Sequence, residues 1–379
     1  TCSGSGLTYA LTSVSVAPNG DVYFAMNANT NNFEVADGLY RWTAAGISRV
    51  YVGDATMQVF HLSVGTRRAY LADRHCIREL ELGASGAPAT LLRTIGNCAS
   101  VNNTNTPTDG LLTPGLVLVN PTSCPGAPNP CPTQMDLDNI DDVFIHEDGS
   151  VYFVDNRNSA ANPSRILRYL PDASGGLVQY VRTGGNAEST YTTAMAPGPD
   201  GGLLRSLMTN ATARQITWIN AEGVEQRVVG NPVVASADIR DGLPGTSFSN
   251  FQVDGAQQAD GGGAIAEFGG DVYFSDLGQS LSVGTRDRIL RFDARTRRVF
   301  TFVGQPVIGL CTSSCMGVAT PGSVVVNNLE AGQRVGARAA DLGSNAAGRY
   351  DFEFRGDGTM FLAMASGLFA VEPANEAGL

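Results

Sequence analysis

Lysine is absent from this chain of 379 residues, so each of its 25 basic residues is an arginine. They are outnumbered by 36 acidic residues, which gives a net charge of −11. Binding to nucleic acid depends on a clustered basic surface, so we expect no nucleic-acid partner. The chain also lacks a run of 18 apolar residues, so we expect no transmembrane segment.

Several catalytic motifs are missing too. The sequence contains no G-x-S-x-G elbow, no H-E-x-x-H zinc motif, no G-x-x-x-x-G-K phosphate loop and no C-x-x-C-H haem site. Three histidines are present, His61, His75 and His146. One of them as a general base stays open, although no serine or cysteine partner is identifiable. These absences favour a binding role over catalysis.

Repeated short strands organise what is present. The phrase "DVYF" occurs at 21–24 and again at 271–274, and "SVYF" occurs at 150–153. The 45 glycines and 18 prolines limit long helices. Six copies of a unit of about 40 to 50 residues can be aligned, each with up to four alternating strands, which is typical of the blades of a β-propeller.

The sequence therefore predicts an all-β fold, a single six-bladed β-propeller domain over 1–379 with four-stranded antiparallel blades. The last copy lacks its fourth strand, and residues 6–12 form a spare strand at the other end of the chain. We expect this N-terminal strand to complete the last blade and close the ring, which removes an open sheet edge. The predicted blades are 13–54, 57–97, 137–185, 191–231, 263–304 and 349–373.

Two copies carry a more specific pattern. Asp155 is followed by "RILR" at 165–168, and Asp276 is followed by "RILR" at 288–291. These segments resemble NHL-type repeats, in which a strand that ends in Asp leads into an "N-R-I" strand. Met26, Leu207 and Met364 depart from the pattern in three other copies. The resemblance implies a propeller used mostly for binding, with some enzymatic members.

Long connections gather on one predicted face. They are 27–37 and 156–164 within blades, and 98–136, 231–262 and 305–348 between blades. "TPGLVLVN" at 113–120 resembles "TPGSVVVN" at 320–327, in two insertions that follow opposed blades. We interpret them as a duplicated cover that extends two sheets, with jaws around a ligand as the alternative. Functional residues commonly lie on such loops.

Cysteine spacing indicates disulfides and an oxidising compartment. Six of the seven cysteines fall into near neighbours, and their spacings do not match zinc knuckles. Proximity suggests the pairs Cys76 with Cys98, Cys124 with Cys131, and Cys311 with Cys315. Cys2 is left over as a lipid tether, an assembly contact or a free thiol. The predicted location is extracellular, periplasmic or at the cell surface.

Candidate site residues are mostly aspartates. Asp73, Asp155 and Asp276 end the second strand of three blades, where capping or pairing with Arg is the simpler interpretation. Counting back seven residues from Gly149 and Gly358 places Asp142 and Asp351 at equivalent positions of opposed blades. Asp136, Asp138 and Asp142 could hold Ca²⁺, and Asp155 with Asn156 could contribute to a metal site. A solvated acidic rim is the alternative.

These observations lead to three hypotheses. The first is a non-enzymatic binding or assembly protein, extracellular or surface-exposed, that holds a protein or glycan partner on the face with the long loops and needs no cofactor. The second is a divalent-metal-dependent hydrolase or lyase at the channel mouth. The third is a structural subunit of a filament or envelope complex.

Overall fold

A computed structural model describes most of the predicted blade residues. The described residues are 8–30, 33–53, 57, 59–84, 87–98, 117–119, 135, 137–156, 164–171, 177–183, 191–210, 213–233, 239, 241–248, 264–276, 288–304, 324–325, 340–342, 350–364 and 367–373.

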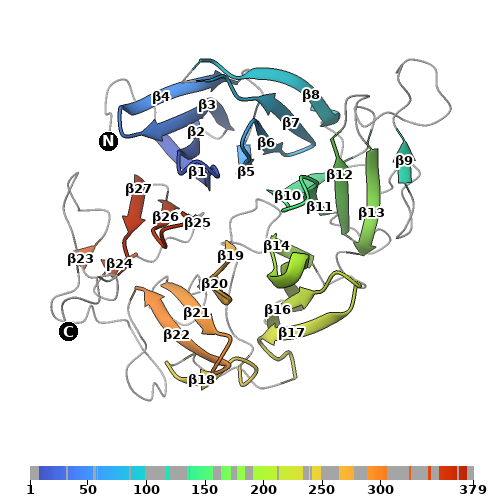
Figure 1. The fold of residues 1–379 in the computed structure, drawn as a ribbon, viewed down its shortest axis with the longest axis vertical. Coiled ribbons are helices and arrows are strands. Elements are labelled where there is room, and N and C mark those ends of the chain that lie inside the picture. Colours follow the sequence, from blue (N-terminus) through green and yellow to red (C-terminus); the bar gives the residue numbers. More distant parts are fainter. Residues whose placement is uncertain are drawn as a thin grey trace.

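Six antiparallel sheets surround a central axis, as predicted, and form a six-bladed β-propeller (Figure 1). Blade 1 contains β1 (Thr8–Val16), β2 (Val22–Thr30), β3 (Phe33–Thr43) and β4 (Gly46–Val52). Blade 2 contains β5 (Val59–Val64), β6 (Arg68–Asp73), β7 (Cys76–Glu81) and β8 (Thr90–Gly96). Blade 3 contains β10 (Asn139–Ile145), β11 (Val151–Asn156), β12 (Arg165–Leu170) and β13 (Leu177–Thr183).

The second half of the ring repeats this order. Blade 4 contains β14 (Tyr191–Pro197), the 3-10 turn η3 (Pro199–Gly201), β15 (Leu203–Asn210), β16 (Ala213–Ile219) and β17 (Glu225–Val229). Blade 5 contains β19 (Ile265–Phe268), β20 (Asp271–Asp276), β21 (Arg288–Asp293) and β22 (Arg298–Val303). Blade 6 contains β25 (Tyr350–Phe354), β26 (Met360–Met364) and β27 (Gly367–Val371).

Hydrophobic side chains fill the spaces between neighbouring blades. Each of the six interfaces has its own buried cluster. Between blades 1 and 2, for example, Leu39 and Leu71 are fully buried. A blade buries its two faces only against its neighbours, so the ring is the smallest unit that can hide this surface from water.

Tight turns with a glycine link the first two strands of blades 1, 3 and 6. Gly20, Gly149 and Gly358 have φ values of +85°, +80° and +85°, a region that residues with a side chain rarely adopt. These are the turns of "PNG", "EDG" and "GDG" in the sequence. Glycine at these positions therefore fixes where each inner strand ends and the next strand begins.

The predicted ring closure by residues 6–12 is wrong for the residues described. Residues 8–12 belong to β1, the innermost strand of blade 1, and pair with β2: Tyr9 lies opposite Ala28 and Leu11 opposite Met26. Blade 6 has three strands among the described residues. Blade 6 instead packs directly against blade 1, since Phe361 of β26 joins Val14 and Val22 in one buried cluster.

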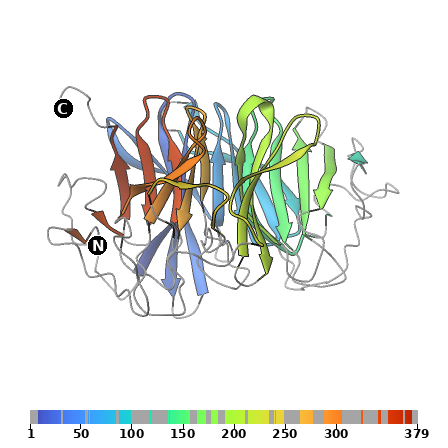
Figure 2. The same ribbon diagram turned by 90° about the horizontal axis from the view of Figure 1, so that it is seen from below.

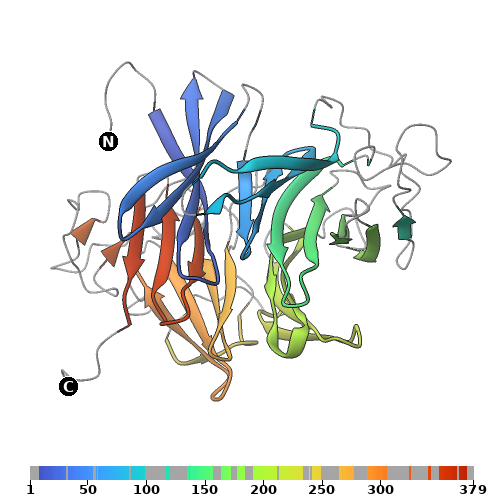
Figure 3. The same ribbon diagram turned by 45° about the horizontal axis from the view of Figure 1, so that its top comes forward.

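The predicted loop at 27–37 is also different. Its described residues continue β2 to Thr30 and begin β3 at Phe33, with Asn27 opposite Ala36. Together with the start of β1 they form a three-stranded sheet that projects beyond the ring on the side of the β2–β3 connection (Figures 2 and 3). The pairing of β2 with β3 extends beyond the blade, and the first part of β1 supplies the third strand of this extension.

Two insertions add a strand to an outer blade edge. β9 (Val117–Val119), from "TPGLVLVN", pairs antiparallel with β13 and widens blade 3. β18 (Leu243–Pro244) does the same for β22 of blade 5. In the similar segment "TPGSVVVN", β23 (Val324–Val325) pairs parallel with β24 (Ala340–Asp341). The described part of one insertion therefore extends a sheet, as the cover interpretation predicts.

No helix in the described parts of the chain has the length and apolar character needed to cross a membrane.

Candidate functional site

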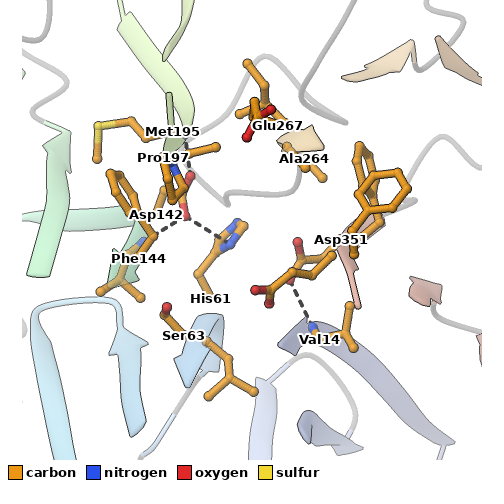
Figure 4. A pocket seen from close by; sticks show the side chains of 18 of the residues that line it. Val14, His61, Ser63, Asp142, Phe144, Met195, Pro197, Ala264, Glu267 and Asp351 are labelled. Carbon is orange, nitrogen blue, oxygen red and sulfur yellow. Dashed lines mark hydrogen bonds and ion pairs between the residues drawn. The ribbon is translucent and has the colours of Figure 1, made fainter. Parts of the chain in front are cut away.

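The inner strands of the six blades line a channel along the axis of the ring (Figure 4). Polar side chains come from blades 2, 3, 5 and 6: His61, Ser63, Asp142, Glu267, Asp351 and Glu353. Blades 4 and 5 contribute alanines to the same wall, Ala196, Ala264 and Ala266. The wall formed by blades 2, 3 and 6 is thus mostly polar, whereas the wall formed by blades 4 and 5 is mostly apolar and carries one acidic side chain, Glu267.

Side chains on the polar side join each blade to the next. The innermost strand has a free edge, and its backbone N–H groups need acceptors. Ser13 Oγ accepts from Leu62 N–H at 3.0 Å, and Ser63 Oγ accepts from Ile145 N–H at 2.9 Å. Asp142 accepts from Met195 N–H in the following blade. These bonds tie blades 1 to 4 together at the axis.

The same connection closes the ring between blades 6 and 1. Asp351 Oδ2 accepts from Val14 N–H at 2.9 Å and from the hydroxyl of Ser13. Glu353 Oε2 accepts from Val16 N–H at 2.8 Å. Alanines in blades 4 and 5 have no side-chain acceptor for such a bond. Asp351 and Glu353 therefore have a structural role at the join between the two ends of the described chain.

The side chains of His61 and Asp142 lie close together in the channel. Nδ1 of His61 lies 3.3 Å from Oδ1 of Asp142, and both side chains are about 95% buried. Val143 N–H donates to the same carboxylate at 2.7 Å. Both side chains point into the space between the blades, which Asp351 and Glu267 also face (Figure 4).

Burial raises the pKa of two of these carboxyls. The pKa of Asp142 is raised to about 6, chiefly because burial disfavours its charged form, with His61 acting in the opposite direction. The pKa of Glu353 is raised to about 7 by burial, against the lowering effect of Val16 N–H, and nearby Asp351 adds to the increase. Burial in the channel therefore disfavours the ionised form of these two carboxyl groups.

The space between these side chains is a cavity of about 180 Å³. Its alanine side is open because Ala196, Ala264 and Ala266 stand where the other blades carry longer side chains. Typical sites for drug-sized ligands are ~300–1,000 Å³, so only a small molecule would fit.

The aspartates at the strand ends make buried ion pairs with arginine. Asp155 lies 2.6 Å from Arg165, and both side chains are at most 2% exposed. Asp276 and Arg288 approach to 2.8 Å, and Asp73 and Arg78 to 2.9 Å. This matches the simpler interpretation of these residues. The arginine that follows each aspartate in the NHL-like pattern thus neutralises it inside the blade.

The proposed calcium ligands do not form an oxygen-rich cage among the described residues. Asp138 is buried, and its backbone N–H donates to Asp155 Oδ1 at 2.8 Å. Asn156 binds Asp141 and Ser164 through its side chain. Asp142 is directed into the channel. Asp136 lies outside the described residues. Ca²⁺ takes six to eight oxygen ligands, and here most carboxylate oxygens already accept internal hydrogen bonds.

One of the three predicted disulfides lies within the described residues and is confirmed. Cys76 and Cys98 are bonded, with their Cα atoms 4.9 Å apart. The bond links the first residue of β7 to the residues that follow β8. Cys2, Cys124, Cys131, Cys311 and Cys315 fall outside the described residues.

The other two histidines lie at turns between strands. Nε2 of His146 lies 3.0 Å from the carbonyl oxygen of Gly201, and Nδ1 lies 3.1 Å from Asp148, so His146 links the turns of blades 3 and 4. Burial, followed by the charge of Arg74, lowers the pKa of His75. Of the three histidines, His61 is therefore the one that lines the channel cavity.

Sequence reasoning found Asp142 and Asp351 but missed Glu353, Ser13 and the alanines. The count of seven residues before the hairpin glycine that located Asp142 also gives Ser13 from Gly20 and Ala194 from Gly201. A count of five gives Glu353 and Ala196. The signal was present in the sequence, because a strand directs every second residue to the same side.

Comparisons with known proteins support the fold. No protein-family model matches the sequence, and no curated protein is similar to it. Among solved structures, the chain is similar to a structural genomics protein of unknown function from Bacteroides thetaiotaomicron, with 14% identity and a TM-score of 0.52, covering 97% of this chain and 71% of that one. It is also similar to Hadza microbial sialidase Hz136, with 10% identity and a TM-score of 0.50, covering 96% of this chain and 66% of that one. A putative 6-phosphogluconolactonase from Bacteroides uniformis matches with 13% identity and a TM-score of 0.45, covering 97% and 82%. The fold defines the class, a six-bladed β-propeller.

Proposed function

We propose that this chain is a non-enzymatic binding protein of an oxidising, extracytoplasmic environment, and that it holds a protein or glycan partner on the face of the projecting sheet. The observation that carries the proposal is that sheet, formed by the first part of β1, the end of β2 and the start of β3 (Figure 2). It lies on the side of the β2–β3 connection, where the long loops are expected. Binding residues commonly lie on such extensions of a rigid scaffold.

The arrangement of the carboxylates supports binding over catalysis. Asp73, Asp155 and Asp276 neutralise buried arginines. Asp142 and Asp351 accept backbone N–H groups of the neighbouring blade. The first three therefore have a structural role within a blade, and the last two join neighbouring blades. The Cys76–Cys98 disulfide supports the compartment, since structural disulfides persist mainly outside reducing cytosol.

Photo-crosslinking in the cells that make the protein tests this proposal. A photoreactive amino acid would replace Asn29, in the projecting part of β2, and in a matched variant Asn19, in the hairpin turn at the opposite end of the strands. We expect one crosslinked product of defined mass from position 29 and none from position 19. Equal crosslinking from both positions, or none from position 29, would contradict the proposal.

A hydrolase or lyase at the channel is the second candidate. The specific observation in its favour is the His61–Asp142 pair beside the cavity, because a carboxylate can orient a histidine as a general base. Turnover of simple esters or lactones that is lost in His61→Gln would favour it. The third hypothesis, a structural subunit tethered through Cys2, would be favoured by concentration-dependent assembly or by a lipid mass on that residue.

A further inference from the structure

The two sides of the channel cavity differ in a way that defines a ligand. One side presents Asp142, Asp351, Glu353 and His61, and the other presents Ala196, Ala264 and Ala266, with Glu267 as its one acidic side chain. None of the described residues that line the cavity is an arginine. This contrasts with the strand-end aspartates, which each have an arginine partner. The channel carboxyls thus lack a strongly basic neighbour of the kind that neutralises their counterparts inside the blades.

Among the described residues, the bonds that Asp351 and His61 make within the ring use one polar atom of each side chain. Both bonds to Asp351 end on Oδ2, so neither engages Oδ1. The backbone bond to Glu353 ends on Oε2, and the side chain of Ser15 also donates a hydrogen bond to this carboxyl group. His61 meets Asp142 through Nδ1, which leaves Nε2 as its second polar atom, and the ring faces the cavity (Figure 4). A donor placed beside Asp351 Oδ1, His61 Nε2 and the Glu353 carboxylate would find partners from two blades, because a carboxylate oxygen can accept more than one hydrogen bond.

The apolar side limits what the rest of the ligand can be. Alanine methyl groups offer no hydrogen bond, so the part of a ligand that lies against them must be hydrocarbon. Phe354 and Phe268 are stacked, with ring centroids 4.8 Å apart, and also line the cavity. Aromatic rings are favourable neighbours for both hydrocarbon and cationic groups. The volume of about 180 Å³ restricts the ligand to a small molecule.

We propose that the channel cavity is a binding site for a small alkylammonium compound. Its ammonium group donates to Asp351, Glu353 and His61, and its alkyl part lies against the alanines of blades 4 and 5. A divalent metal ion suits the site less well, because Asp142, Asp351 and Glu353 already accept backbone N–H groups and the alanines of the opposite wall offer no ligand atoms.

Binding of n-butylammonium, compared with its neutral analogue 1-butanol and its anionic analogue butyrate, tests the charge requirement. Ligand-observed NMR on the full chain would give the dissociation constants at pH 8. We expect n-butylammonium to bind at least tenfold more tightly than 1-butanol, and butyrate not to bind. Equal binding of the ammonium compound and the alcohol would overturn the proposal.

Two variants place the binding in the channel. Glu353→Gln removes a charged acceptor and should weaken n-butylammonium binding about tenfold or more, since hydrogen bonds to charged groups are the stronger ones. Ala266→Val fills the apolar side and should reduce the affinity for the same ligand by a similar factor. The matched control is Ala370→Val, at an exposed position of β27, which should bind as the wild type does.

Circular dichroism would verify that each variant is folded before its affinity is compared. Unchanged binding in both folded channel variants would overturn the assignment to this cavity. Displacement of n-butylammonium by micromolar Ca²⁺ would also overturn the proposal, because it would show that the acceptors form a metal site.

Discussion

Replacing Glu353 by glutamine should stabilise the protein at alkaline pH. Glu353 lies in the channel, and burial raises its pKa from 4.5 to about 7. Glutamine keeps an oxygen that can accept from Val16 N–H but carries no charge. The substitution therefore removes the cost of a buried charge and keeps the bond that joins blade 6 to blade 1.

The size of the effect follows from the two pKa values. Above pH 7 the side chain is charged in both the folded and the unfolded state, and the pKa difference corresponds to at most ~3 kcal/mol of lost stability. Because Glu353 is partly open to the cavity, screening reduces this to roughly 1–2 kcal/mol. The folded state holds its proton more tightly, so this stability is present below pH 4.5 and is lost as the pH rises through about 7.

Urea unfolding followed by far-UV circular dichroism at pH 5 and pH 8 would measure the difference. We expect Glu353→Gln to be more stable than the wild type at pH 8 and nearly equal to it at pH 5. The control Glu222→Gln, in an exposed turn of blade 4, should leave both values unchanged. The reasoning is refuted if Glu353→Gln loses as much stability between pH 5 and pH 8 as the wild type does.

Three further predictions concern single contacts. Asp155→Asn leaves the buried Arg165 without its carboxylate and should lower the free energy of unfolding in urea by ~3–5 kcal/mol. Asp357→Asn, in an exposed ion pair, should change this free energy little. Equal losses in the two variants would be inconsistent with the burial of the Asp155–Arg165 pair. Cys98→Ser should cost ~3 kcal/mol under oxidising conditions and nothing in reductant; a loss that persists in reductant would show another cause. Ser13→Ala removes the acceptor for Leu62 N–H and should cost ~1–3 kcal/mol; wild-type stability would refute that role.

The repeat in the sequence was enough to predict the propeller and most of its strands. Alternating residues and hairpin glycines are local signals, and they located blade 4 even where its motif was weakest. The arginines of the "RILR" segments could also be placed, because Asp155 lies directly opposite Arg165 in the strand register, as Asp276 lies opposite Arg288.

The errors arose where a strand had more than one available partner. Residues 8–12 could pair in blade 6 or extend β1, and pairing with the end of β2 prevailed because both strands continue in register past the ring. Sequence alone could not reveal the His61–Asp142 pair, since it joins residues 81 positions apart through the arrangement of two blades. The cavity was hidden for the same reason, because alanines of two separate blades create it together.

Native mass spectrometry of the purified protein with and without chelator tests most directly the claim that the channel carboxylates are structural acceptors in a binding protein. The account predicts the same mass in both samples, with no stoichiometric divalent ion, and an unfolding temperature that does not change on chelation. One divalent ion per chain that the chelator removes, with loss of an esterase or lactonase activity, would contradict the account and favour the metal-dependent enzyme.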